Sequence, residues 1–342
     1  MKVLIAMSGG LKSLVTAWLL KKQGMQVRGV YLDLLGPDES MDRVGSLERK
    51  LGISIQIIPV QKEFSELLGL AQKNAFQNGD LLDPGLFFHR SFLFPRLLEL
   101  KEQHQFDRLA TGHRVLVQED QISKVFRVFQ NADGDFSEVP YLLGRTQKEL
   151  SSLLLPLGSI PSSMFGKLSL ELDTGGTQGG TITWDNKLKV SEPESALPFE
   201  VLTATGNRLG IYHSVTLPSP GQVYRLQETP ELIYRIIDVS FEKHQMTVAS
   251  EPEMRLSELQ FCDVSWFAHA DLGLRPIECS VISPLQKRAI GVRMLQYEGA
   301  QIKAFLNQPL EAIEANIFKG QTMLWVEGSE ILGGGCVLGT RE

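Results

Sequence analysis

Residues 2–22 have the sequence KVLIAMSGGLKSLVTAWLLKK, and this stretch decides the fold of the first half of the chain. The run KVLIAM (2–7) is apolar throughout, which is typical of a parallel β-strand buried on both faces. SGG (8–10) then turns the chain. Residues 13–23 follow helical spacing, and Gly24 ends the pattern. The stretch therefore predicts a strand, a glycine turn and a helix.

The alternation of strand and helix continues along the first half of the chain. Apolar runs predict further strands, and amphipathic segments predict further helices. The strands are expected at 27–34, 54–60 and 107–113, and the helices at 42–51, 64–76 and 87–104. This order is typical of a parallel α/β sheet with helices on its faces. We therefore expect an α/β domain over residues 1–150.

The second half has a different periodicity. Residues 143–158 favour a turn and a helix, and SEPESALP (191–198) is typical of a linker, so we expect a small central region at 151–198. Short alternating runs follow, separated by turn residues every ~10 positions, which predicts an all-β barrel over 199–342. The runs are EVLTAT, RLGIYHSV, YRIIDVS, QMTVAS, FCDVSWF, IECSVIS, AIGVRML, EAIEANI, TMLWVEG and EILGGGCVL.

The charge of the chain is modest and uneven. Lys and Arg number 34 and Asp and Glu 40, so the net charge is −6. Residues 1–160 carry 19 basic and 18 acidic side chains, and residues 161–342 carry 15 and 22. This balance lacks the basic character of a strong nucleic-acid binder, although it allows a local basic patch. No apolar run reaches the ~20 residues of a membrane span, so we expect a cytoplasmic protein without a membrane partner.

The three cysteines, Cys262, Cys279 and Cys336, all lie in the all-β half. No CxxC pair occurs, which excludes the common zinc-finger and dithiol redox motifs. Cys279 alternates with Ile277 and Val281, so we expect it on the buried face of a strand. All three cysteines are expected to be core thiols.

SGGLKS (8–13) is the most informative motif. It joins a buried strand to a helix N-terminus at the carboxyl edge of the predicted sheet, where backbone N–H groups and the helix dipole favour phosphate. Its glycines allow a ligand to approach the backbone, and Ser8 and Ser13 add hydroxyl donors. It is not a Walker A loop, because G-x-x-x-x-G-K-[ST] is absent. The motif predicts a phosphate or nucleotide site; the alternative is a tight turn without a ligand.

SGGLKS resembles the SGGxDS pyrophosphate-binding loop of the ATP-pyrophosphatase, or PP-loop, superfamily. The chain as a whole is similar to one family within it, the bacterial tRNA-specific 2-thiouridylases, with a weak patch at about 160–195. The matching segments are AMSGGLKSLVTAWLLKKQGMQVRGVYLDL (6–34), MDRVGSLERKLGI (41–53), GDLLDPGLFFHRSFLF (79–94), RLATGH (108–113), PLG (156–158), LSELQFCDVSWF (256–267), RPIECSV (275–281) and FKGQTMLWVEGSEILGGGCV (318–337).

The resemblance implies an adenine nucleotide alpha hydrolase-like domain that binds ATP or AMP and acts on tRNA. In such enzymes ATP adenylates the uridine carbonyl oxygen. The implied nucleotide positions are Ala6, Met7, Ser8, Gly9, Gly10, Leu11, Lys12, Ser13, Gly112 and, on the adenine side, Leu32. His113 and Gln321 match tRNA-contacting positions; the alternatives are a structural hydrogen bond for His113 and a β-turn for Gln321. His89 and Arg90 are either polar pocket residues or solvated helix residues.

The chain departs from the family pattern where the chemistry lies. The acid that helps hold Mg²⁺ in SGGxDS is Lys12 here, and a cation cannot bind Mg²⁺; it either pairs with a phosphate or lies in solvent. The first family cysteine falls at Phe88, and the Asn that follows it falls at His89. The segment expected to hold the second cysteine, 172–182, has none, and the family's D-Q-S-Y-F-L appears as EVPYLL (138–143).

Three hypotheses follow. The first is a thiouridylase homologue that has lost sulfur transfer but keeps a nucleotide or phosphate site, with weak, largely Mg²⁺-independent ATP or AMP binding and weak tRNA binding. The second is an ATP-dependent enzyme of altered chemistry, acting on tRNA or another substrate. The third is a scaffold that binds neither ligand. Nucleotide binding separates the third hypothesis from the others, and pyrophosphate release separates the second from the first.

Overall fold

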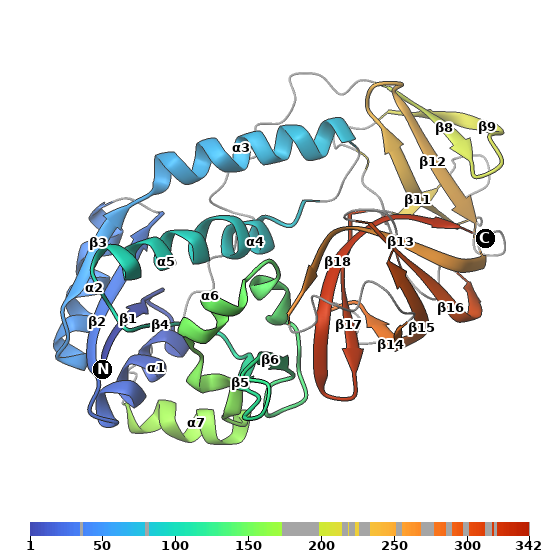
Figure 1. The fold of residues 1–342 in the computed structure, drawn as a ribbon. Helices are drawn as coiled ribbons and strands as arrows, with labels where there is room; N and C mark the ends of the chain where they lie inside the picture. Colours follow the sequence, from blue (N-terminus) through green and yellow to red (C-terminus); the bar gives the residue numbers. More distant parts are fainter. Residues whose placement is uncertain are drawn as a thin grey trace. The chain divides into compact units, whose positions relative to one another are not determined.

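The structure, a computed structural model, divides into two compact units. The first contains Met1–Leu68, Pro84–Leu188 and Gly328–Leu332, and the second contains Gly69–Asp83, Lys189–Glu327 and Gly333–Glu342. Figure 1 shows the α/β elements in blue to green and the all-β elements in yellow to red. The residues described are 1–34, 37–78, 82–172, 198–213, 218, 223–225, 233–250, 255–267, 277–284, 289–296, 301–311, 317 and 320–341.

A five-stranded parallel sheet forms the centre of the first unit, in the order β3-β2-β1-β4-β7. Val3 and Ile5 of β1 have no exposed surface, as the apolar run predicts. The chain adds β2 and β3 on one side of β1 and then returns to its other side, so the gap between β1 and β4 is the switch point at which such sheets bind ligands. The strands are β1 (Lys2–Ala6), β2 (Gln26–Asp33), β3 (Ile55–Pro59), β4 (Arg108–Ala110) and β7 (Leu153–Leu154).

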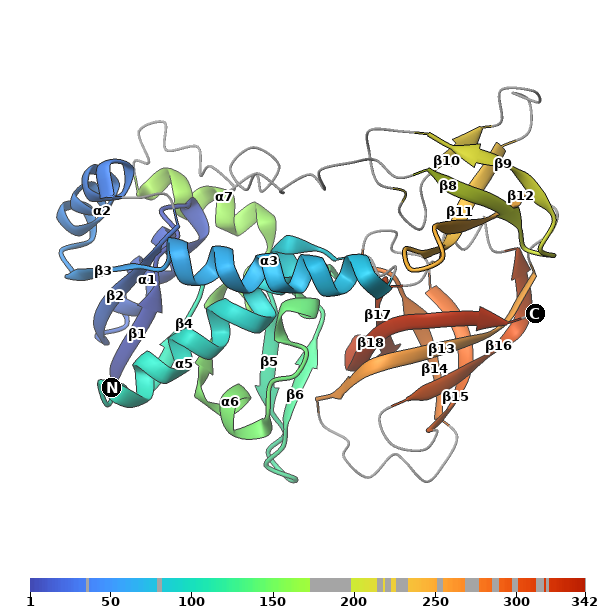
Figure 2. The ribbon, with the colours of Figure 1, turned by 90° about the horizontal axis from the view of Figure 1, so that it is seen from above.

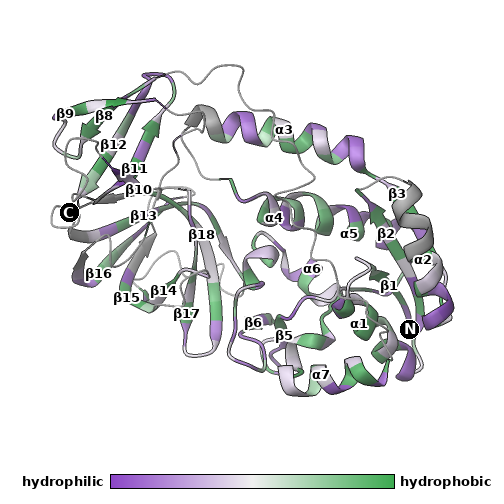
Figure 3. Cartoon of the chain, turned by 180° about the vertical axis from the view of Figure 1, so that it is seen from behind, coloured by the Kyte–Doolittle hydropathy of each residue, from purple (hydrophilic) through white to green (hydrophobic). Residues whose placement is uncertain are grey.

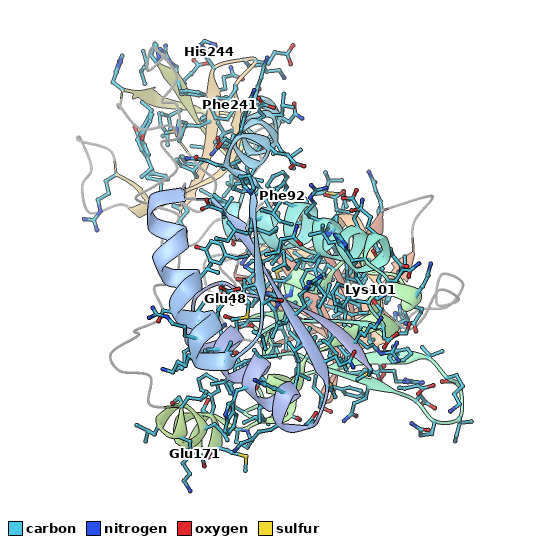
Figure 4. The ribbon with its side chains drawn as sticks, turned by 90° about the vertical axis from the view of Figure 1, so that its left-hand side faces the viewer. Glu48, Phe92, Lys101, Glu171, Phe241 and His244 are labelled. Carbon is cyan, nitrogen blue, oxygen red and sulfur yellow. The ribbon has the colours of Figure 1, made fainter. Side chains whose placement is uncertain are left out.

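Helices cover both faces of this sheet. α1 (Leu11–Lys22), α2 (Pro37–Leu51) and α7 (Ser162–Glu171) share one apolar cluster with β1, and α1 is mostly hydrophobic (Figure 3). α5 (Phe94–Gln103) lies on the other face, against β4 (Figure 2). Glu48 of α2 accepts a hydrogen bond from the Ile55 N–H at 2.7 Å, which ties α2 to the start of β3 (Figure 4).

The helix expected at 87–104 is three consecutive segments: α4 (Pro84–Phe87), the π-helical turn η1 (Phe88–Leu93) and α5. The Phe94 N–H donates to the carbonyl of His89, five residues back. Pro95, near the start of α5, has no N–H to donate, so the ordinary helical ladder cannot continue through it. Such π-turns are frequent at functional sites. The other expected helices are present with shifted bounds: the one at 13–23 is α1, the one at 42–51 begins at Pro37, and the one at 64–76 is α3 (Gln61–Asn78).

The segment at 143–158 differs from the expected turn and helix. It contains α6 (Gln147–Ser152), the two-residue strand β7 and the 3-10 turn η3 (Pro156–Ser159). Sequence analysis also missed the hairpin of β5 (Leu116–Glu119) and β6 (Phe126–Phe129). These strands are too short to show a period, and their partners are distant in sequence: β6 pairs with Glu330 and Ile331 of β18.

Apart from the C-terminal part of α3, the described elements of the second unit are β-strands, so the expected fold class is confirmed. One five-stranded sheet has the order β10-β11-β12-β8-β9, and the strands β13-β16-β15-β14-β17-β18 close into a barrel because β13 also pairs with β18. The first sheet contains β8 (Phe199–Thr203), β9 (Arg208–Tyr212), β10 (Val223–Arg225), β11 (Ile233–Ser240) and β12 (Gln245–Ser250). The barrel contains β13 (Arg255–Trp266), β14 (Ile277–Ile282), β15 (Ala289–Gln296), β16 (Ile302–Glu311), β17 (Thr322–Glu327) and β18 (Glu330–Arg341).

Sequence analysis missed β10 and β16. β16 has the sequence IKAFLNQPLE, in which Asn307, Gln308 and Pro309 weaken the alternation. Most of the expected strand EAIEANI lies outside the described residues, as does most of the region 151–198. The division at residues 150 and 198 therefore stays a prediction. Among the described helices, none combines the length and the apolar character needed to cross a bilayer.

The cysteines are less buried than expected for core thiols. Cys262, Cys279 and Cys336 are each partly exposed. Burial is still the main reason that the pKa of the Cys279 thiol rises to about 12.

Gly158, in the PLG segment, provides a test of the packing in the first unit. A Cβ at this position would overlap the backbone carbonyl of Val115. We expect Gly158→Ala to lower the free energy of unfolding by ~2–4 kcal/mol, measured by urea denaturation, because backbone must move to admit the methyl group. Gly166→Ala in α7 is the matched control: a Cβ there meets nothing within 4 Å, so helix propensity should raise stability by ~0.5–1 kcal/mol. A Gly158→Ala variant as stable as the wild type would contradict this packing.

Candidate functional site

A pocket of about 450 Å³ lies in the first unit, at the carboxyl end of β1. This is the place that the strand order favours for a ligand, and the volume is in the usual range for small-molecule sites. The turn after β1, the end of β2 and the end of β4 form its walls, and η1 and α7 contribute further side chains. The lining residues are Ala6, Met7, Ser8, Gly10, Leu11, Lys12, Ser13, Val30, Tyr31, Leu32, Leu34, Phe88, His89, Leu93, Thr111, Gly112, His113 and Phe165.

The structure brings together nearly all of the residues expected at the nucleotide site. Gly9 is the exception, since it does not line the pocket. Its φ of 77° instead gives the turn after β1 its shape, in the left-handed region that favours glycine. The nucleotide-binding role of this set stays a prediction, because a shared lining does not identify a ligand.

The serines of the SGGLKS loop order the loop itself. The Ser13 hydroxyl donates to the Gly10 carbonyl at 2.9 Å, and the Ser8 N–H donates to the Ser13 hydroxyl at 3.3 Å. Gly112 packs tightly on the first turn of α1, where a Cβ would lie 2.9 Å from the Lys12 carbonyl carbon and from the Ser13 nitrogen. The absence of a side chain at Gly112 therefore lets the end of β4 approach the N-terminus of α1, whose dipole favours an anion.

Lys12 forms an ion pair with Glu138, with Nζ 2.6 Å from Oε1. The other carboxylate oxygen, Oε2, accepts a hydrogen bond from the Arg114 N–H at 2.8 Å. The Lys12 side chain is 48% exposed and that of Glu138 is 18% exposed. Lys12 is thus not simply solvated. Glu138 was not among the site residues expected from the sequence. The one sequence feature that pointed to it is that it is the first residue of EVPYLL.

This ion pair makes the site unsuitable for Mg²⁺ held as the family resemblance implies. Mg²⁺ requires carboxylate or phosphate oxygens in a strict octahedral arrangement. Here one acid position is occupied by the Lys12 ammonium, and both oxygens of Glu138 already have partners. A divalent cation bound to Glu138 would lie within a few Å of that ammonium, and like charges at such distances repel strongly. The residues present therefore do not fit the metal.

Two histidines form a hydrogen-bonded chain at the pocket wall. His113 Nδ1 lies 2.7 Å from the Thr111 hydroxyl, and His113 Nε2 lies 3.1 Å from His89 Nδ1. The Thr111 oxygen also accepts the backbone N–H of His113 at 3.4 Å. The same contacts fit both directions of donation along this chain, because each ring nitrogen donates in one tautomer and accepts in the other. The His89 ring stacks on Tyr141 with a centroid distance of 4.2 Å.

Both rings are neutral at physiological pH. Burial is the main reason that the pKa of His89 falls to about 2, and the neighbouring His113 lowers it further. Burial likewise lowers the pKa of His113 to about 3, with a smaller effect of the Lys12 charge. The solvated alternative is wrong for His89, which lines the pocket and is largely buried.

Phe88 and Gln321 are buried and take part in ordinary packing and hydrogen bonding. Phe88 is 6% exposed and packs on Phe64 and Phe92, with centroid distances of 5.1 and 5.9 Å. Gln321 is buried in the second unit, where its amide donates to the Ser283 hydroxyl at 2.8 Å. The tRNA-contacting roles of His113 and Gln321 stay predictions. The segment 172–182 lies outside the described residues except for Leu172.

Comparison with known proteins identifies the family. A sequence profile described as the tRNA methyl transferase HUP domain matches residues 1–173, which include every residue of the pocket. The chain belongs to this family. The chain is similar to the tRNA-specific 2-thiouridylase MnmA of Symbiobacterium thermophilum, which is 25% identical over 98% of this chain and 92% of that protein. The protein of the same name from Campylobacter jejuni is 23% identical over 98% of this chain and 100% of that protein.

Likeness to solved structures is weaker. The NH3-dependent NAD synthetase from Campylobacter jejuni matches 50% of this chain and 64% of that chain, with 19% sequence identity and a TM-score of 0.33. This value is too low to bear on the function of the HUP-domain chain.

The buried histidine pair predicts a pH dependence of stability. The pKa values of His89 and His113 in the folded protein lie well below the usual 6.5. Below pH ~6.5 the unfolded state therefore binds protons that the folded state does not, and stability is lost as pH falls. We expect each histidine to cost ~2 kcal/mol of unfolding free energy by pH 5 relative to pH 7.

The matched variants are His89→Gln, which removes one titrating ring of the pair, and His104→Gln, which changes an exposed histidine. Urea denaturation at pH 7 and pH 5 should show a smaller loss of stability for His89→Gln than for the wild type, and the wild-type loss for His104→Gln. Equal losses in the wild type and in His89→Gln would show that the pair does not titrate as the structure indicates.

Proposed function

We propose that this protein is a tRNA 2-thiouridylase homologue that binds a nucleotide or phosphate at the β1 loop and does not carry out thiolation. The observation that carries this proposal is the Lys12–Glu138 ion pair at the position where the family resemblance implies a metal-binding acid. A pocket that supplies its own cation can hold an anionic ligand, yet it cannot align ATP through Mg²⁺ for adenylation.

The ligand in this proposal is ATP or AMP, bound without metal. An ammonium group has three donors, and one of those of Lys12 goes to Glu138, so a phosphate oxygen can accept from another. The first-turn N–H groups of α1 supply further donors to the same anion. Leu32, at the end of β2, supplies an apolar surface for the base, and the neutral His89 supplies a polar ring in place of a charge. We expect weak affinity for ATP or AMP, because no metal ion neutralises part of the phosphate charge.

The absence of the two family cysteines supports the proposal that this protein does not carry out thiolation. Transfer of sulfur in this family, as the resemblance implies it, passes through cysteine, and the thiolate is the reactive form. No cysteine precedes residue 262 in this chain. Phe88 occupies the position of the first family cysteine. Its ring packs among other aromatic rings and offers no nucleophile.

A second candidate function is an ATP-dependent reaction of altered chemistry. The chain Thr111–His113–His89 favours it, because neutral imidazoles beside a pocket can form hydrogen bonds that orient a reacting group. Release of pyrophosphate from ATP would distinguish this function from simple binding. A scaffold without any ligand is the remaining alternative.

The proposed RNA partner is tRNA, since the similar proteins are named as tRNA-specific enzymes. We expect weak binding. The net charge of −6 gives little long-range attraction to phosphate, so any affinity must come from a local patch. His113 and Gln321 are buried at 8% and 3% exposure, so either side chain would have to become exposed to touch RNA.

Calorimetric titration with ATP and AMP, with and without Mg²⁺, tests the proposed site. We expect weak binding of the wild type that changes little with Mg²⁺. Lys12→Asp should gain Mg²⁺ dependence of about tenfold or more, because the introduced carboxylate and that of Glu138 together would offer an acid pair. Lys62→Asp is the matched control: it makes the same charge change at an exposed position of α3 outside the pocket.

Two outcomes of this titration would contradict the proposal. A wild-type affinity for ATP or AMP that rises tenfold or more with Mg²⁺ would mean that the metal binds despite the Lys12–Glu138 ion pair. No heat with either nucleotide at millimolar concentration would favour the scaffold alternative.

A further inference from the structure

Cys262 and Cys336 lie directly opposite each other on neighbouring antiparallel strands. Cys262 is on β13 and Cys336 is on β18, and the two residues are partners in the register of that pair. The pairing of β13 with β18 is the one that closes the barrel. Both cysteines are thiols in the structure, and both belong to the second unit.

The alternation along the two strands places both thiols on one face. Phe261 and Val337, the preceding partner pair, are 0% and 1% exposed and face the barrel interior. Successive residues of a strand point to opposite faces, so Cys262 and Cys336 share the outer face, where both are partly exposed. Thr322 is on β17, the neighbour of β18 on the side away from β13, and its hydroxyl lies 3.7 Å from the Cys336 sulfur, so the Cys336 side chain must rotate away from Thr322 to meet Cys262.

The strand register suits a bond between these two cysteines. Opposed residues of an antiparallel pair have Cα atoms ~4.5–5.5 Å apart, inside the ~4.4–6.8 Å range of disulfides. The Cys262 sulfur already lies 3.6 Å from the carbonyl oxygen of Cys336. Between Cys262 and Ser265 the register shifts by a bulge, with Asp263 at a φ of 48°. A bulge bends the strand and increases its local twist.

We propose that Cys262 and Cys336 form an oxidation site that takes a low-molecular-weight disulfide, such as oxidised glutathione, and becomes a cross-strand disulfide. One cysteine thiolate attacks a sulfur of the small disulfide, which forms a mixed disulfide and releases one small thiolate. The second cysteine thiolate then attacks the protein sulfur of that mixed disulfide and releases the other small thiolate. Two protein thiols are oxidised, one small disulfide is reduced to two thiols, and the two protein protons pass to them.

The consequence would be a covalent closure of the barrel. The bond would join residues 74 positions apart and fix the β13–β18 pairing. Linking such distant positions restricts the unfolded chain strongly. Cys279 does not take part: its partner across β15 is Val292, and burial holds the pKa of its thiol at about 12. It is the natural internal control.

The test uses the full chain, incubated with oxidised glutathione at pH 8 and then denatured for thiol titration and peptide mass mapping. We expect the thiol count to fall from three to one and a peptide cross-linked between Cys262 and Cys336 to appear. Dithiothreitol should restore three thiols. Cys279→Ser should still form the cross-link, whereas Cys262→Ser and Cys336→Ser should form only mixed disulfides with glutathione.

Two outcomes would overturn the proposal. One is wild-type protein that carries glutathione at Cys262 or Cys336 with no cross-linked peptide at any glutathione concentration. The other is a cross-link found only between two copies of the chain, seen as a dimer on a non-reducing gel.

Discussion

The ion pair between Lys12 and Glu138 connects the segments around the pocket. Lys12 is in the first turn of α1, Glu138 precedes the 3-10 turn η2 (Val139–Leu142), and the second oxygen of Glu138 holds the Arg114 N–H after β4. Because Lys12 is half exposed, the pair contributes at most about 1 kcal/mol to stability. Its larger effect is on the charge of the site. The Lys12 ammonium, paired with the Glu138 carboxylate, stands where the family resemblance implies an acid that binds the metal.

The buried histidines complete this electrostatic picture. Protonation of His89 or His113 would add a positive charge close to Lys12 in a poorly solvated place, and burial with mutual repulsion keeps both rings neutral. The pocket therefore offers one cation, neutral N–H donors and the positive end of α1. This set is consistent with the anion of the proposed function, and the described residues that line the pocket include no acid that would hold a divalent metal.

The sequence predicted those features that depend on local pattern. The apolar run before SGG, the glycine turn and the helix after it lie where the residues indicate, and so do most of the strands expected in the second half of the chain. Long-range contacts were not predictable. β7 is two residues long and exists because β4 offers it a partner, β16 loses its alternation at Asn307 and Pro309, and Glu138 matters because Lys12 reaches it across 126 positions. Cys262 and Cys336 are opposite each other because of the register of β13 and β18. This register could not be predicted from the sequence pattern.

The central claim is that the chain keeps the fold and the nucleotide pocket of its family but lacks the sulfur chemistry. Loss of an essential nucleophile costs about 10⁴-fold or more in rate, and under the proposed function both activation and transfer are affected. The most direct measurement is the 2-thiouridine content of tRNA, by mass spectrometry, in a strain that lacks its own thiouridylase and expresses this chain. The account predicts background levels for the wild type, and also for Phe88→Cys, since the second cysteine and the acid at position 12 would still be missing. Restoration of normal 2-thiouridine by the wild-type chain would contradict it.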